Sequence, residues 1–205
     1  MTLVEFFAKG GMLMIVLLII SIIAVAMFIE RYLTIKKAAK FEEKTFIEVL
    51  RMIDQHHPAE ASKICKLSES SICKILEQGL SYADTDVNLA QETIEQSSNQ
   101  FISTLEKNIG TIATFAAIAP LIGFLGTVTG MIKVFFEMQQ SEVGVDIQVL
   151  SGGIWEALIT TVGGLVVGIV CIVFHNYLIS KIESIAFLMG EKTSQVCVHL
   201  RRFQK

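Results

Sequence analysis

Residues 10–29 read GGMLMIVLLIISIIAVAMFI, a run of 20 residues without a charged side chain. At a helical rise of about 1.5 Å per residue such a run is about 30 Å long, the thickness of the hydrocarbon core of a bilayer. Two further apolar runs follow, one between Lys107 and Lys133 and one between Asp146 and Lys181. The sequence therefore predicts an all-α integral membrane protein with three transmembrane helices.

The composition supports this class, because 52% of the residues are hydrophobic and only 18% are charged. A soluble domain of 205 residues could not bury so much apolar surface, so part of it must face lipid. The net charge of -3 and the lack of a dense basic stretch exclude nucleic acid as an expected partner. The four cysteines form no C-x-x-C pair, which predicts free thiols and no metal site. Nothing in the sequence calls for a cofactor.

Lysine and arginine gather on one side of the predicted spans. They follow the first span at Arg31, Lys36, Lys37, Lys40 and Lys44, and the third at Lys181, Lys192, Arg201, Arg202 and Lys205. The basic side of a membrane protein is cytoplasmic, so we expect the N-terminus outside and the C-terminus inside. The predicted order is an outer segment (1–9), transmembrane helix 1 (10–29), a cytoplasmic helical region (30–107), transmembrane helix 2 (108–132), a short periplasmic loop (133–147), transmembrane helix 3 (148–180) and a cytoplasmic tail (181–205).

The cytoplasmic region shows helical spacing of its apolar residues. Two such stripes are Phe46, Val49, Leu50 and Ile53, and then Ile72, Ile75, Leu76 and Leu80. Pro58 indicates a helix start, and the stretch 84–86 indicates a break. From Val87 a stripe continues into the second span, which predicts one uninterrupted helix from cytoplasm to membrane. The stripes pack among the protein's own helices or form a docking face for another protein.

Small residues line one face of each of the last two spans. In the second span they are Ala116, Pro120, Gly123, Thr127 and Gly130, with Gly126 completing a G-x-x-x-G. In the third they are Gly153, Ala157, Thr160, Thr161, Gly164 and Gly168. Helices in lipid associate through close backbone packing, so these faces predict tight helix contacts, within one chain or between copies.

Glu156 is the one formally charged residue within the third run. An acid at the centre of a span costs roughly 2.5–3.5 kcal/mol, so such residues usually serve a pathway. A helix that starts near Ile147 puts Glu156 roughly 13 Å in, which is also compatible with the outer mouth beside Trp155. Hydroxyls at Thr127, Thr160 and Thr161 suit a hydrated proton path, although a membrane threonine more often bonds its own backbone. Both interpretations stay open on spacing alone.

Three stretches resemble the ExbB/TolQ/MotA family of proton-channel subunits, and ExbB and TolQ most closely. They are IER at residues 29–31, APLIGFLGTVTG at 119–130 and GGIWEALITT at 152–161. The second is similar to the family's A-P-x-x-G-L-L-G-T-V-x-G, and the third to its G-I-x-E-A-L-x-x-T. About ten residues precede the first span, fewer than in many ExbB proteins, which leaves the choice between ExbB and TolQ open.

The resemblance implies a pentamer of identical chains around a central pore in the inner membrane. The pore would enclose the single membrane helices of an ExbD-like partner, and proton flow would drive motion that a TonB-like protein delivers to the outer membrane. The family's pore residues fall on Thr127, Glu156 and Thr161, while Thr160 rests on spacing alone. The family's chief proton-binding aspartate belongs to the partner.

The sequence features favour one function class over three others. A proton-channel subunit that energises TonB-dependent transport leads, with a TolQ-like subunit for outer-membrane maintenance as the nearest alternative. A non-conducting oligomeric scaffold would use the small-residue faces only for assembly. A solute transporter is disfavoured because three spans contain no inverted repeat or broken-helix pair, and an enzyme because no catalytic pair can be named.

Overall fold

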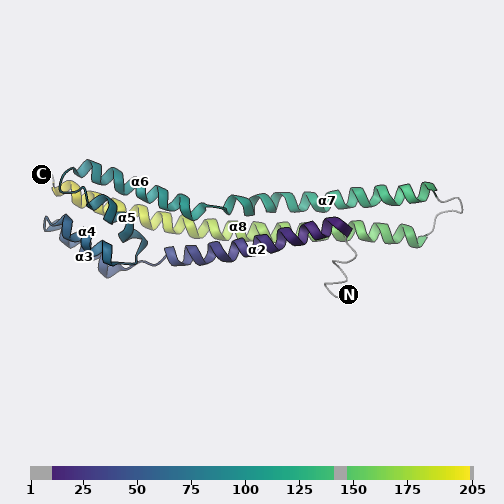
Figure 1. Cartoon of the computed structure of the whole chain (residues 1–205), viewed down its shortest axis with the longest axis horizontal. Helices are drawn as coiled ribbons and strands as arrows, with labels where there is room; N and C mark the ends of the chain where they lie inside the picture. Colours follow the sequence, from purple (N-terminus) through teal and green to yellow (C-terminus); the bar gives the residue numbers. More distant parts are fainter. Residues whose placement is uncertain (1–10, 141–146, 204–205) are drawn as a thin grey trace. The chain divides into compact units, whose positions relative to one another are not determined.

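The computed structural model describes residues 11–140 and 147–203, and all regular elements in these ranges are α-helices (Figure 1). In chain order they are α2 (Gly11–Ala38), α3 (Glu43–Asp54), α4 (Pro58–Leu67), α5 (Ser71–Leu80), α6 (Val87–Glu106), α7 (Ile109–Gln140) and α8 (Ile147–Phe203). The predicted outer segment 1–9 and positions 141–146 of the predicted periplasmic loop lie outside the described residues. The predicted all-α class is confirmed for the described chain.

Three helical stretches are long and apolar enough to cross a membrane. They are Gly11–Ala38, Val87–Gln139 and Leu150–Arg202. A helix satisfies its backbone hydrogen bonds within itself, which the hydrocarbon core of a bilayer requires. The number of spans agrees with the number that the sequence predicts.

The expectation of one uninterrupted helix from Val87 into the second span is wrong. The helix α6 ends at Glu106, and α7 begins at Ile109. Between them Lys107 adopts an extended ψ of 133° and Asn108 a left-handed φ of 67°, which asparagine tolerates better than most residues. Leu105 and Ile109 are both buried on either side of this joint. The apolar stripe therefore continues across a break in the helix. Because the spacing of apolar residues is unchanged there, periodicity alone does not reveal the break.

The described chain divides into two compact units. The first contains residues 11–30, 108–140 and 147–177, and the second contains residues 31–107 and 178–203. The helix α8 is continuous and contributes to both, so the predicted boundary between transmembrane helix 3 and a cytoplasmic tail falls inside one helix of 57 residues.

The first unit is built from the first part of α2, all of α7 and the first part of α8. Its buried cluster consists of Met14, Leu17, Ala119 and Ile159, contributed by all three helices. The ring of Phe28 on α2 stacks on Phe174 of α8 with centroids 4.0 Å apart. Each helix therefore contributes to one shared core.

Glycine lets the backbones of α7 and α8 approach closely in this unit. A side chain at Gly164 would lie 2.5 Å from the carbonyl oxygen of Ala119 and 2.8 Å from the Cα of Gly123. One at Gly126 would lie 2.5 Å from the methyl carbon Cγ2 of Thr160. Both contacts are closer than two non-bonded atoms allow, so a larger residue would force the helices apart.

The same contact extends toward both ends of the two helices. A side chain at Gly130 would lie 2.8 Å from Cβ of Ala157, and one at Gly168 would lie 2.7 Å from Cγ of Pro120. We call the five glycines the glycine seam: Gly123, Gly126, Gly130, Gly164 and Gly168. The two small-residue faces thus meet within one chain, and α7 runs antiparallel to α8 along the seam.

The second unit packs α3, α4, α5 and α6 with the last part of α8. The apolar stripes that the sequence predicts are buried, with Phe46, Val49 and Ile53 in α3 and Ile72, Ile75, Leu76 and Leu80 in α5. As predicted, α4 begins at Pro58, whose fixed φ suits the first helical turn. Asp86 caps α6 by accepting hydrogen bonds from the backbone N–H groups of Asn88 and Leu89, at 2.8 and 3.2 Å. Of the two interpretations of the stripes, packing among the protein's own helices is confirmed.

We expect Gly164→Ala to destabilise the chain, because its Cβ would collide with backbone atoms that cannot rotate away. Overpacking of this kind typically costs about 1–3 kcal/mol. Unfolding in mild detergent, followed by circular dichroism, measures the loss. Gly152→Ala is the matched control, since nothing lies within 4 Å of a side chain there on the same helix. Equal stability of the two variants would contradict the proposed close contact.

Candidate functional site

The sequence-predicted site residues all lie in the first unit, on α7 and α8. Thr127 is on α7, and Glu156, Thr160 and Thr161 are on α8, which begins at Ile147 as the sequence suggests. Glu156 is therefore nine residues into the helix, or roughly 13 Å by helical rise. Its side chain is half-buried, while Trp155 beside it is 47% exposed. The acid thus faces the protein interior more than its aromatic neighbour does.

The carboxylate of Glu156 lies against the start of α2. A side chain at Gly11, the first residue of α2, would collide with Oε1 of Glu156. Gly11 has a φ of 64°, a conformation that glycine adopts at little cost. The first N–H groups of a helix lack intrahelical partners and carry a partial positive charge, which favours a nearby carboxylate. Sequence reasoning missed this contact, although the glycine at the head of the first span is a signal that could have suggested it.

Thr161 connects the two helices of the glycine seam. Its hydroxyl donates a hydrogen bond of 2.8 Å to the backbone carbonyl of Gly123 on α7. A side chain at Gly123 would lie 3.1 Å from the Cα of Thr161, so any larger residue would push the two backbones slightly apart. The contact joins residues 38 positions apart and could not be found from either motif alone.

The other two threonines bond the backbone of their own helices. Thr160, which is buried, donates to the carbonyl of Glu156 at 2.9 Å. Thr127, half-buried, donates to the carbonyl of Phe124 at 2.7 Å. All three hydroxyl protons thus point at carbonyl oxygens. The hydroxyl oxygens of Thr127 and Thr161 keep acceptor capacity for another molecule. Within the described residues the Thr127 hydroxyl forms no hydrogen bond with Glu156 or Thr161.

Apolar side chains that the chain does not cover surround these polar groups. On α7 they include Leu121, Phe124 and Leu125, and on α8 Leu158, Val162 and Val166. Such surface is expected of helices that face lipid or neighbouring chains. The polar site residues therefore stand out against an apolar background.

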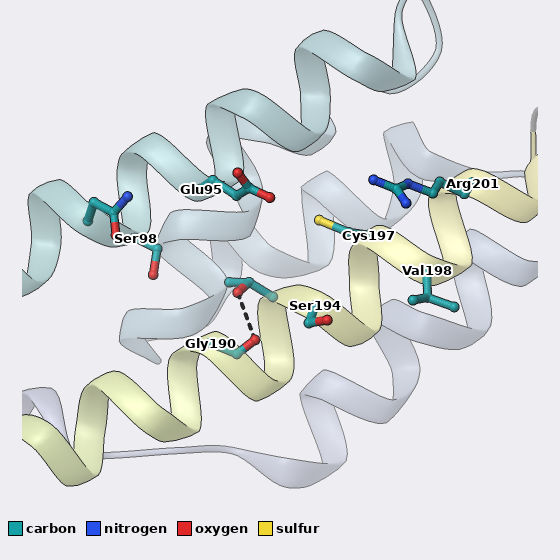
Figure 2. Close-up of a pocket in the computed structure, with 9 residues that line it drawn as sticks. Glu95, Ser98, Gly190, Ser194, Cys197, Val198 and Arg201 are labelled. Atoms are coloured by element: carbon teal, nitrogen blue, oxygen red, sulfur yellow. Dashed lines mark hydrogen bonds between the residues drawn. The ribbon is translucent and has the colours of Figure 1, made fainter.

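A polar groove of about 400 Å³ lies between α6 and α8 in the second unit (Figure 2). Glu95 and Ser98 of α6 face Ser194, Cys197 and Arg201 of α8 across it. Sequence reasoning assigned no role to this groove. Among the described residues, no three His, Cys, Asp or Glu side chains come close enough to hold a metal ion.

Side chains beside the groove fasten α6 to α8. Gln91 donates from Nε2 to the carbonyl of Cys197 at 3.1 Å, and Arg201 donates from Nε to Oε1 of Gln91 at 3.2 Å. Gln91 is only 8% exposed, so both ends of its amide are satisfied where water has little access. These two hydrogen bonds hold α6 and α8, the helices on either side of the groove, against each other.

All four cysteines are free thiols, as the sequence predicts. Cys65 on α4 and Cys73 on α5 are both buried and hydrogen-bond each other. That hydrogen bond raises the pKa of Cys65, with burial adding to the rise, and lowers the pKa of Cys73 to about 6. The pair therefore favours a state in which one thiol keeps its proton and stabilises its partner as a thiolate.

The chain matches known proteins over the region that contains both long motifs. The sequence pattern of the MotA/TolQ/ExbB proton channel family fits residues 67–191. A biopolymer transport protein of Synechocystis named ExbB-like 3 is 29% identical over 198 residues, covering 95% of this chain and 93% of that protein.

Two shorter matches come from proteins with established family names. Biopolymer transport protein ExbB of Salmonella typhimurium is 36% identical over 87 residues, 42% of this chain and 35% of that protein. Tol-Pal system protein TolQ of Haemophilus influenzae is 33% identical over 87 residues, 42% of this chain and 38% of that protein. Both matches span little more than a third of the relative's length.

We expect Thr161→Val to destabilise the contact between α7 and α8, because it removes the hydroxyl that bonds the Gly123 carbonyl. Interhelical hydrogen bonds in membrane proteins contribute about 0.6 kcal/mol on average and up to about 1.7 kcal/mol. Unfolding in mild detergent gives the difference from the wild type. Thr114→Val is the control, since the exposed Thr114 hydroxyl bonds only its own helix at the Gly110 carbonyl. If both valine variants were equally stable, the interhelical bond would contribute nothing.

Proposed function

Because this chain belongs to the MotA/TolQ/ExbB proton channel family, we propose that it is a proton-conducting subunit of a motor that turns proton-motive force into mechanical work. Thr127, Glu156 and Thr161 would line its proton pathway, with Thr160 in support. The observation that carries the proposal is the placement of Glu156 and the threonine hydroxyls along one pair of apolar helices. An acid retained at that depth costs free energy that packing alone does not require.

The hydroxyl geometry suggests how such a pathway works. The protons of Thr127 and Thr161 point at backbone carbonyls, so their oxygens offer acceptors to whatever enters the pore. A protonated carboxylic acid or a water molecule is the donor that such oxygens suit. In our proposal the acid belongs to an ExbD-like partner with a single membrane helix. Glu156, held near the head of α2, would help to admit protons or hold that partner.

The proposed assembly is a homo-pentamer around a central pore. The glycine seam is filled within one chain, so its five glycines are not available to pack against a second copy. The surfaces that remain for assembly are the uncovered apolar faces of α7 and α8, such as Phe124 at 63% and Leu158 at 55% exposed. A ring of chains would cover part of these faces and would leave the rest to lipid.

The process that we propose for this motor is TonB-dependent transport across the outer membrane. A TonB-like protein would transmit the mechanical work. The support is the similarity to ExbB-named proteins, of which one matches along nearly the whole chain. A TolQ-like role in outer-membrane maintenance is the second candidate, because the Haemophilus TolQ match has the same length as the Salmonella ExbB match.

The proposed location is the inner membrane, with the N-terminus periplasmic and the C-terminus cytoplasmic. The proposed spans remain 10–29, 108–132 and 148–180. The regions 30–107 and 181–205 would be cytoplasmic, and 1–9 and 133–147 periplasmic. The support is the excess of lysine and arginine after the first and third spans.

The proton pathway predicts that Thr127→Val and Glu156→Ala abolish energy-dependent uptake in cells that also carry the partner. Thr127 bonds only its own helix, so its valine variant removes the acceptor oxygen with little change in volume or stability. Thr127→Ser and Thr161→Ser keep the oxygen and should retain activity. Native mass spectrometry in mild detergent checks that every variant keeps the oligomer size of the wild type. Full activity of both Thr127→Val and Thr161→Val would sink the hydroxyl-lined pathway.

The proposed orientation predicts which introduced cysteines react from outside the cell. Cys65 and Cys73 are buried, so the test uses a chain in which all four native cysteines are serine. A membrane-impermeant maleimide should label Gln139→Cys, at the exposed end of α7, in intact spheroplasts. It should label Ser81→Cys, which is exposed in the second unit, only after permeabilisation. The reverse pattern would invert the orientation.

A further inference from the structure

A pocket of about 530 Å³ in the second unit is lined by three lysines from three different segments. Lys37 comes from the end of α2, Lys40 from the connection to α3, and Lys74 from the first turn of α5. Glu69 is the one acidic residue in the lining. The pocket therefore carries net positive charge.

The three ammonium groups have no carboxylate partner in the described parts of the chain. Ion pairs in those parts of the chain, such as Lys192 with Glu191 and His199 with Asp54, include no lysine of the pocket. Like charges gathered in one hollow repel one another, and an anion placed among them would relieve that repulsion. The lining thus has the electrostatics of an anion site.

Hydroxyl and backbone donors add to the lysines. Ser71, the first residue of α5, lines the pocket and contributes a hydroxyl group. Thr104 also lines it, but its hydroxyl donates to the Gln100 carbonyl of its own helix at 2.9 Å. The N-cap Ser70 makes no capping hydrogen bond with its side chain, so the first N–H groups of α5 are not satisfied from that side. Those N–H groups favour a phosphate, as helix N-termini generally do.

The pocket also has an apolar floor. Phe101 and the buried Leu105 of α6, with Ala38 of α2, complete its lining. Arg31 helps to hold α2 beside α6, since it donates from Nη1 to the carbonyl of Thr104 at 3.4 Å. A lining that combines basic groups with apolar side chains suits a ligand that is both anionic and apolar, rather than a small hydrated ion.

The path of α2 brings two residues of this lining close to the level of lipid headgroups. The first apolar run ends at Ile29, and α2 continues unbroken to Ala38. By helical rise, Thr34 lies roughly 6 Å beyond Glu30, inside a headgroup layer about 5–7 Å thick. The Cα of Lys37 lies roughly 10 Å beyond Glu30, just past that layer, and its long side chain can reach back to the phosphates. We propose that this pocket binds the phosphate-bearing headgroup of an anionic phospholipid, with the upper part of an acyl chain along Phe101 and Leu105.

The polar groove between α6 and α8 provides a contrast within the same unit. It sets Glu95 against Arg201, so its charges balance, and its lining is rich in hydroxyl and amide groups (Figure 2). Because its charges cancel, that groove offers an anionic lipid no net electrostatic attraction. The lysine pocket differs from it in both charge and apolar lining.

The test uses the full chain in mild detergent, with native mass spectrometry to measure binding of short-chain phosphatidylglycerol and of phosphatidylcholine with the same acyl chains. We expect the wild type to prefer phosphatidylglycerol at least tenfold. Each basic residue near a lipid surface contributes about fivefold in affinity, so Lys37→Gln with Lys74→Gln should weaken phosphatidylglycerol binding by about 25-fold. Binding of phosphatidylcholine should not change.

The matched control is Lys63→Gln with Lys66→Gln, which removes the same charge from exposed positions of α4 outside the pocket. It should stay within about twofold of the wild type. Lys40→Gln lies between helices and so keeps the test open if the double variant loses helix content by circular dichroism. Equal binding of the two lipids, or equal losses in the pocket and control variants, would overturn the proposal.

A separate arm adds about 10 mM inorganic phosphate in place of lipid and in competition with it. If phosphate alone bound with the same dependence on Lys37 and Lys74, or displaced the lipid, the ligand would be free phosphate and the lipid assignment would be wrong. Proton conduction plays no part in this assay, so its result is independent of the proposed motor function.

Discussion

The direct contact between the backbones of α7 and α8 at Gly123 and Gly164 determines how the membrane unit is built. In lipid there is no hydrophobic force to press helices together, so close van der Waals packing and interhelical hydrogen bonds must supply the association energy. The absence of side chains at these positions brings Thr161 within reach of the Gly123 carbonyl. Without that approach the hydroxyl would turn to its own helix, as those of Thr127 and Thr160 do. Packing therefore decides the hydrogen bonding of the site.

Elements set by local pattern could be predicted from the sequence, and those set by tertiary contact could not. The three spans follow from length and hydropathy, and the start of α4 from Pro58. The break at Asn108 could not be predicted, because the apolar stripe continues across it without a change in spacing. The motifs identified Glu156 and Thr161 as candidates. Their partners, at the start of α2 and on α7, lie far away in the chain and appear only in three dimensions.

Thr161 shows how one residue can carry two roles that are difficult to separate. Its proton belongs to a structural bond, while its oxygen remains open to accept another. A variant that lacks the hydroxyl loses both at once. Thr127 has no such structural task between helices, and it is therefore the cleaner reporter of function. Substitution of Thr127 therefore tests function alone, whereas substitution of Thr161 changes both function and helix packing, although both residues lie in the family's motifs.

The continuity of α8 has an evolutionary consequence for the length of the chain. One residue inserted into an α-helix rotates everything beyond it by about 100°. An insertion between Ile182 and Val196 of α8 would therefore turn Val196 and Leu200 away from the helix face that Leu178 and Ile182 bury, although all four side chains are buried in the second unit. The connection at Lys107 and Asn108 is not helical and can absorb such a change. Length variation among descendants of this chain should accumulate at that joint and be purged from α8.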